Sequence, residues 1–93
     1  MPTKRIYVSG RVQGVSYRDW VVRTAQRAGM IGWVRNLSDG RVEILATSED
    51  ETALDALVEA CREGPAMARV DHVEAHQAEQ EKLTKGFTKR FTA

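Results

Sequence analysis

One short stretch of the chain combines residue types that could bind a phosphate group. It runs Gly10-Arg11-Val12-Gln13-Gly14-Val15-Ser16-Tyr17-Arg18. Gly14 allows a positive φ or a close approach of the backbone to a ligand. Arg18 carries a permanent charge on a planar fork that fits phosphate bidentately. No Gly-Lys-Ser/Thr follows, so the stretch is not a Walker loop. A tight turn followed by a solvated Arg explains the same residues about as well, and both interpretations stay open at this point.

The patterns on either side predict a strand before this stretch and a helix after it. Ile6, Val8 and Val12 share one parity, which is typical of a half-buried strand over residues 4–12. Apolar residues then recur at helical spacing from a start near Ser16 to a stop at Gly29. The first amides of a helix have no intrahelical partner and favour an anion. If the phosphate interpretation holds, the Gly14 turn, the free amides at the helix start and the Arg18 guanidinium would form a small phosphate cradle.

The remainder of the chain predicts three further strands, a second helix and a final short strand. Asp39-Gly40 is a hairpin signal between two strands. Ser48 and Glu51 form a capping-box pattern at the start of the second helix, which Gly64-Pro65 ends. The expected strands cover residues 30–37, 41–47 and 69–77, with a bulge between Val70 and Val73, a loop over 79–86, and Phe87 and Phe91 anchoring the last strand.

This order of elements indicates an α+β fold. Strand, helix, strand, strand, helix, strand is the ferredoxin-like βαββαβ sandwich, with two helices on one face of a mostly antiparallel sheet. We expect a single domain over residues 1–93, because a chain of this length suits one core.

Composition excludes several classes of protein. The net charge is +1, which argues against a nonspecific nucleic-acid binder. No apolar run approaches the ~20 residues of a membrane span. The first residues lack a signal-peptide apolar region, and a single Cys excludes an internal disulfide framework. We therefore expect a cytoplasmic protein with neither a membrane nor a nucleic-acid partner.

The stretch ending at Arg18 resembles the acylphosphatase signature Gly-x-Val-Gln-Gly-Val-x-Phe/Tyr-Arg. A second stretch, Gly32-Trp33-Val34-Arg35-Asn36-Leu37-Ser38-Asp39-Gly40-Arg41-Val42-Glu43, looks like that family's other motif. The resemblance covers residues from about 5 to about 75 and implies the ferredoxin-like fold as well.

The resemblance also implies a reaction and the residues that carry it. The reaction is hydrolysis of a small-molecule acyl phosphate to a carboxylate and inorganic phosphate, without metal or organic cofactor, by a monomer. Arg18 and the loop amides of Gly14, Val15, Ser16, Tyr17 and Arg18 bind phosphate, and Asn36 orients the attacking water. An amide suits that last role because it offers a donor and an acceptor together. Without the resemblance, Asn36 is more simply interpreted as a residue of the hairpin turn.

Other polar and aromatic residues are better explained by structure than by chemistry. His72 and His76 would lie about 13 Å apart on a strand, at ~3.3 Å per residue, so they could not share an ion. Cys61 is interpreted as a buried small hydrophobe. Trp20 and Trp33 are interpreted as packing residues. Tyr17 is expected in the core and Gln13 as a brace for the turn.

The chain departs from the family pattern in three places. Ser16 occupies a variable position and can cap the helix. Thr47-Ser48 stands where the family usually has Gly near the second helix. Lys89 occupies a position where the family prefers an aliphatic residue, which leaves the register of the last strand open.

Two functions from other classes compete with the hydrolase. The first is a noncatalytic anion- or RNA-binding module of the same fold, for which only Tyr7 is a candidate exposed aromatic on the first strand. The second is a regulatory small-ligand module acting with a partner protein. Either module would retain an acyl phosphate without hydrolysing it.

Overall fold

The structure is a computed structural model that describes residues 1–82 and 85–93. The elements begin and end within two residues of the predicted positions. In chain order they are β1 (Thr3–Arg11), α1 (Tyr17–Arg27), β2 (Ile31–Asn36), β3 (Val42–Thr47), α2 (Glu51–Glu63), β4 (Arg69–Gln77) and β5 (Phe87–Lys89).

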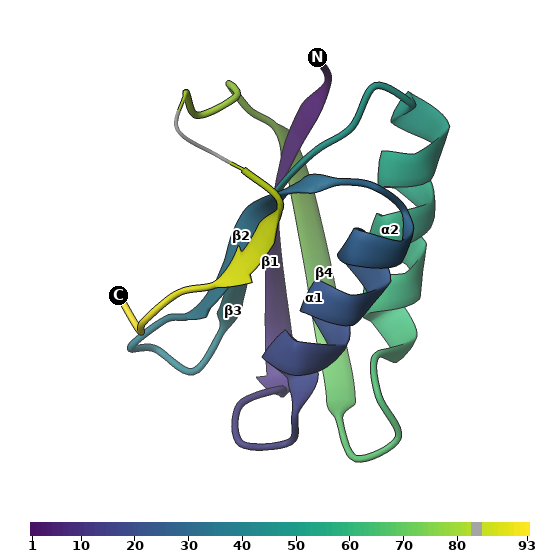
Figure 1. The fold of residues 1–93 in the computed structure, drawn as a ribbon. Coiled ribbons are helices and arrows are strands. Elements are labelled where there is room, and N and C mark those ends of the chain that lie inside the picture. The colour runs from purple at the N-terminus through teal and green to yellow at the C-terminus, as the bar shows by residue number, and fades with distance from the viewer. Residues whose placement is uncertain (83–84) are drawn as a thin grey trace.

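The strands form one sheet in the order β4-β1-β3-β2-β5. The pairs β4-β1, β1-β3 and β3-β2 are antiparallel, and β5 lies parallel to β2. Both helices cover the same face of the sheet (Figure 1). The predicted ferredoxin-like α+β sandwich is therefore confirmed, with a short fifth strand added at the edge beside β2.

The core lies between the helices and the sheet. Alternate residues of the strands, such as Ile6, Val8 and Ile44, face the helices and are fully buried. The helices pack apolar side chains against them, among them Val21, Ala25 and Leu54. Truncating Ile6, Ile44 or Leu54 to Ala would cost about 2–5 kcal/mol, so this layer contributes strongly to the stability of the fold.

The predicted bulge in β4 is confirmed. The register of β4 against β1 pairs Ser9 with His72 and then Gly10 with Val70, so Asp71 is the extra residue. Gly10 has φ +124°, and a Cβ there would lie 2.2 Å from the Arg69 carbonyl oxygen. The bulge and the glycine together bring β1 to its end immediately before the loop that leads into α1.

Two helix caps differ from the sequence prediction. The N-cap of α2 is Asp50, not Ser48, because the Asp50 carboxylate accepts the Thr52 amide at 2.9 Å. The Ser48 hydroxyl instead accepts the Asp50 amide at 3.1 Å. Ser16 precedes α1 in the left-handed conformation and makes no side-chain cap. A side chain can cap only from an extended backbone, and sequence spacing does not report that conformation.

The C-terminal segment follows β2. Phe87 begins β5 and is buried as predicted, whereas Phe91 is 96% exposed and lies outside the strand. In β5, Phe87 lies opposite Gly32 and Lys89 lies opposite Val34. This pairing gives the register of the last strand, which the sequence had left open. The described residues of the predicted loop, 79–82 and 85–86, contain no helix or strand, and residues 83–84 lie outside the described residues. No helix in the described ranges is both long and apolar enough to cross a membrane.

Candidate active site

The loop between β1 and α1 has an unusual backbone. Gly14 and Ser16 both have positive φ, +73° and +63°. Within the described part of the chain, none of the backbone amides of residues 14–18 donates a hydrogen bond, and the first amide to do so is that of Trp20, to Ser16. Alternation of this kind turns successive N–H groups toward one concavity, which suits an anion. The loop therefore presents free donors at the positive end of α1.

A cavity of about 260 Å³ lies against these donors. We call it the cradle cavity; it is lined by Val12, Gly14, Ser16, Tyr17, Arg18, Asp19 and Lys89. Four of the five predicted phosphate-binding residues, Gly14, Ser16, Tyr17 and Arg18, are thus brought together. Val15 is not part of the lining and is half-buried against the core.

Arg18 extends from the first turn of α1 toward the C-terminal segment. Its Nη1 donates to the Arg90 carbonyl oxygen at 3.3 Å. In residues 1–82 and 85–93, no carboxylate lies within ion-pairing distance of its guanidinium. A half-buried guanidinium with one carbonyl contact keeps most of its donors available for a ligand.

Gln13 joins the loop to the other motif. Its side-chain amide donates to the carbonyl oxygens of Leu37 and Arg41, each at 2.9 Å, on the hairpin that follows Asn36. This confirms the predicted brace. The same hairpin carries the Asp39-Gly40 turn, closed by the Gly40 amide donating to Leu37.

Asn36 is the last residue of β2, beside these contacts. The Arg90 amide donates to Val34 at 2.8 Å while the Arg90 carbonyl accepts from Arg18, so one residue connects Arg18 to the strand that ends at Asn36. Asn36 does not belong to the lining of the cradle cavity. Its side-chain oxygen is buried and has no hydrogen-bond partner among the described residues. Buried oxygens are seldom left without a partner, and ordered water commonly supplies one.

Sequence reasoning missed an ion pair at the edge of the cradle cavity. Lys89 Nζ lies 2.8 Å from Asp19 Oδ1, and both residues line the cavity. The hydrogen bond from Lys89, and then its charge, lower the pKa of the Asp19 carboxyl. Lys89 was visible in the sequence as a departure from the family pattern, but only the pairing of β5 with β2 brings it to α1.

The interpretations of Tyr17 and Cys61 hold. The Tyr17 side chain is buried, and its hydroxyl donates to the Cys61 carbonyl oxygen at 2.7 Å, which ties the first turn of α1 to the end of α2. Burial raises the pKa of the Tyr17 phenol above its ordinary value. Burial also raises the pKa of the Cys61 thiol to about 12, which excludes a thiolate nucleophile near neutral pH.

The remaining candidates are two histidines and Trp33, none of which lines the cradle cavity. His72 and His76 are exposed on β4, each near Glu74, and the described ranges contain no group of three His, Cys, Asp or Glu that could hold a metal. Trp33 is only 2% exposed and packs beneath the guanidinium groups of Arg35 and Arg90 at 4.7 Å, which fits its predicted packing role.

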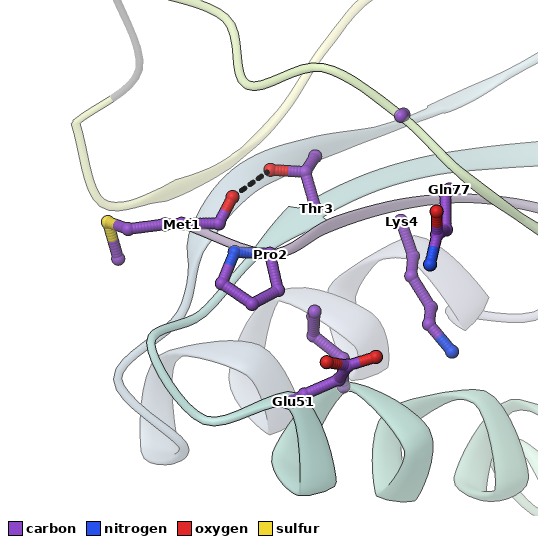
Figure 2. A pocket seen from close by; sticks show the side chains of 8 residues that line it. Met1, Pro2, Thr3, Lys4, Glu51 and Gln77 are labelled. Carbon is purple, nitrogen blue, oxygen red and sulfur yellow. Dashed lines mark hydrogen bonds between the residues drawn. The ribbon is translucent and has the colours of Figure 1, made fainter.

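A further cavity, of about 270 Å³, lies beside the chain start and the first turn of α2 (Figure 2). Lys4, Glu51 and Gln77 are among the side chains that line it. No residue that the sequence assigned to a site belongs to its lining. The start of α1 lies at the other end of the molecule (Figure 1).

Comparison with known proteins identifies the family of the chain. The acylphosphatase family model matches residues 4–89, past the point near residue 75 at which the motif resemblance weakens. An acylphosphatase of Acidiphilium cryptum is 45% identical over 92 residues, 99% of each chain. One from Rubrobacter xylanophilus is 50% identical over 92% of this chain and 77% of its own.

A solved structure extends the agreement to the fold. The crystal structure of acylphosphatase from Bacillus subtilis superposes with a TM-score of 0.89 at 38% identity, over 97% of this chain and 99% of that one. Sequence, family model and fold agree over nearly the whole length. The chain therefore belongs to the acylphosphatase family of hydrolases.

Proposed function

We propose that the protein hydrolyses acyl phosphates by attack of water on phosphorus, with the phosphate held at the start of α1. One observation carries the assignment of this site. The amides of residues 14–18 have no acceptor among the described residues, and they lie beside an Arg18 guanidinium that has no carboxylate partner there. A phosphate accepts several hydrogen bonds at once and carries the matching charge.

The same donors would serve the transition state better than the ground state. In phosphoryl transfer the charge is spread over the three equatorial oxygens of phosphorus. Donors fixed by a loop and a helix need no reorganisation when that charge develops. Arg18 and the loop amides would therefore both bind the phosphate of the substrate and stabilise the transition state.

Asn36 is proposed to hold the attacking water. Its orphaned side-chain oxygen can accept a hydrogen bond from that water, and its Nδ2 can donate. Holding the nucleophile in line with the bond to be broken removes much of the entropy cost of attack. Gln13 would support this position, because it ties the loop to the hairpin next to Asn36.

The bonds and protons balance without a protein base. Water forms the new phosphorus–oxygen bond, the bond to the acyl oxygen breaks, and the carboxylate leaves with the electron pair. A phosphate oxygen of the substrate accepts the proton. Asp19 is the carboxylate of the cradle cavity, but the Lys89 contact lowers its pKa, which makes it a poor base.

The RNA-binding alternative has little support on the sheet. Tyr7, its aromatic candidate, is half-buried with the Arg41 guanidinium stacked 4.7 Å from its ring centroid. Membership of a hydrolase family favours turnover over retention. We further propose that the protein acts in the cytoplasm as a monomer; size-exclusion chromatography with light scattering would test the oligomeric state.

Hydrolysis of benzoyl phosphate by the purified protein tests the proposal. We expect phosphate release that a chelator does not abolish, with competitive inhibition by inorganic phosphate or sulfate. Activity that disappears with chelator and returns with a divalent ion would contradict the mechanism. Tight binding of benzoyl phosphate without release of phosphate would instead identify a binding module.

A further inference from the structure

A second, larger cavity adjoins the cradle cavity. We call it the outer cavity; its volume is about 650 Å³, and it is lined by Arg18, Arg35, Lys89, Arg90 and Phe91. Arg18 and Lys89 line both cavities. A substrate whose phosphate lies in the cradle cavity can therefore extend its acyl group past these two side chains into the outer cavity.

Four of the five side chains that line the outer cavity are cationic. The stems of these side chains and the Phe91 ring can contact an aliphatic or aromatic acyl group, but an uncharged acyl group gives the four cationic ends no anionic partner. A second anionic group on the acyl part would be favoured there. The cavity thus has the electrostatic character of a subsite for an anion separate from the reacting phosphate.

The carboxylates around the outer cavity hold these cations to different degrees. Arg35 pairs with Glu43, whose side chain is only 4% exposed and which Arg5 also contacts. Lys89 pairs with Asp19, and both side chains are about half exposed. Pairs between exposed groups contribute little, so an incoming anion can compete for Lys89, whereas Arg35 stays with its buried partner.

Arg90 is the cation best placed to receive a second anion. Its only carboxylate contact among the described residues is Glu81, at 3.4 Å and between half-exposed side chains. Its guanidinium stacks 4.7 Å from the Trp33 ring centroid, which limits its rotamers. Its backbone is fixed by bonds to Val34 and Arg18. A guanidinium held in this way loses little freedom when it binds a carboxylate or phosphate.

We infer that the outer cavity selects acyl phosphates whose acyl group carries a second negative charge, a carboxylate or a phosphate. Arg90 and Lys89 are the specificity-determining residues, and exposed Phe91 at the rim contacts the carbon skeleton between the two anions. The inference rests on the proposed hydrolase function and names the substrate class of the same site.

A matched pair of substrates tests it: benzoyl phosphate and 4-carboxybenzoyl phosphate. Both contain the same scissile bond, and the second adds one rigidly placed carboxylate. The measured quantity is the ratio of their kcat/KM values, each corrected for spontaneous hydrolysis. We expect a ratio of at least about fivefold in favour of the carboxylated substrate, the size of one partly exposed ion pair.

Charge-removing variants locate the effect. Arg90→Met and Lys89→Met keep an unbranched side chain and should each lower the ratio by about threefold or more, within the range of an exposed pair. Arg62→Met is the matched control: Arg62 lies on α2, pairs with Glu59 and does not line the outer cavity. It removes the same net charge and should leave the ratio unchanged. Circular dichroism verifies that each variant is folded.

The outcomes separate the two proposals. Hydrolysis of both substrates with a ratio near one would overturn the inference and leave the hydrolase function intact. A high ratio that survives both Arg90→Met and Lys89→Met would overturn the assignment to the outer cavity. Hydrolysis of neither substrate would overturn the proposed function and the inference together.

Discussion

The two helices of this protein begin in opposite ways. At α2, Asp50 is extended and closes the helix start: its side chain accepts the Thr52 amide, and its carbonyl accepts the Ala53 and Leu54 amides. At α1, Ser16 is left-handed, its hydroxyl makes no cap, and within the described chain the amides of residues 14–18 remain without acceptors. The two starts lie at opposite ends of the molecule (Figure 1).

This difference in capping indicates that the two helix starts serve different purposes. A left-handed residue other than Gly costs roughly 1–2 kcal/mol, and an absent cap costs about 1 kcal/mol more. Both unfavourable features occur at the start of α1, where Arg18 and Lys89 line the cradle cavity. At α2 the Asp50 carboxylate accepts the Thr52 amide, and Glu51 adds an anion beside the cavity of Figure 2. Among the described residues, Asp50 accepts three of the first amides of α2, whereas the amides of residues 14–18 at the start of α1 have no acceptor.

The largest expected effect comes from Arg18, the charged half of the open start. Arg18→Lys keeps the charge but loses the planar fork, so it should fail nearly as badly as Arg18→Ala. We expect a loss of at least ~3 kcal/mol of transition-state stabilisation, measured as kcat/KM for benzoyl phosphate. The fold should survive, because the one hydrogen bond that the guanidinium makes within the described residues is to the Arg90 carbonyl. Retention by Arg18→Lys of more than about a tenth of wild-type kcat/KM, a loss under ~1.4 kcal/mol, would contradict a bidentate role.

Asn36→Ala should have a slightly smaller effect and a different signature. The amide is proposed to hold water, so kcat should fall by about a hundredfold or more, as for a lost orienting group. Inhibition by inorganic phosphate should change little, since residues 14–18 are intact. Arg18→Ala should weaken that inhibition, so the two variants separate chemistry from binding.

The thermal unfolding midpoint of the Asn36→Ala variant must be measured beside its kinetics. The Asn36 backbone carbonyl accepts the Ala93 amide, and the residue ends β2, so a loss of rate could also reflect a loss of fold. A folded Asn36→Ala protein with near-normal kcat would refute the assignment. Asn36 would then be only the turn residue that its sequence context suggests.

Stability experiments sharpen the contrast with the smallest changes. Asp50→Ala removes the cap of α2 and should cost about 1 kcal/mol of unfolding free energy. Ser16→Gly relieves the left-handed backbone of α1 and should gain up to about 1 kcal/mol. In a chain of this size each change shifts Tm by roughly 4–8 °C.

These two substitutions should also differ in their effect on the phosphate site. Asp50→Ala should leave phosphate inhibition unchanged, because the cradle cavity lies at the other helix. A stabilising effect of Asp50→Ala, or a destabilising effect of Ser16→Gly in urea unfolding, would show that the two helix starts do not differ as described.

Local patterns predicted much of this molecule because they act over a few residues. The alternation of Ile6 and Val8 predicted β1, and Asp39-Gly40 predicted the hairpin, since both depend on near neighbours. The two N-cap predictions were wrong. Ser16 and Ser48 have side chains that can cap a helix, but capping also depends on the backbone angles φ and ψ of the residue. Those angles are imposed by the loop as a whole.

The outer cavity could not be predicted from the sequence, because it depends on contacts between segments far apart in the chain. Arg18, Arg35 and Arg90 come from three distant segments, and the parallel pairing of β5 with β2 assembles them. A three-residue strand has no periodicity that could reveal this pairing. The orphaned oxygen of Asn36 is likewise a property of tertiary burial. Motif resemblance singled out Arg18 and Asn36 as candidates, but it could not show the cationic side chains that surround Arg18 in the outer cavity.

The central claim is that the open start of α1 binds phosphate through its amides, and an amide-resolved NMR titration with inorganic phosphate tests it most directly. We predict saturable chemical-shift changes that are largest at the amides of residues 14–18 and absent at residues 52–54 of α2. In Arg18→Ala the same amides should respond only at much higher phosphate concentration. Saturable changes centred on residues 52–54, or no saturable change at residues 14–18, would contradict the claim.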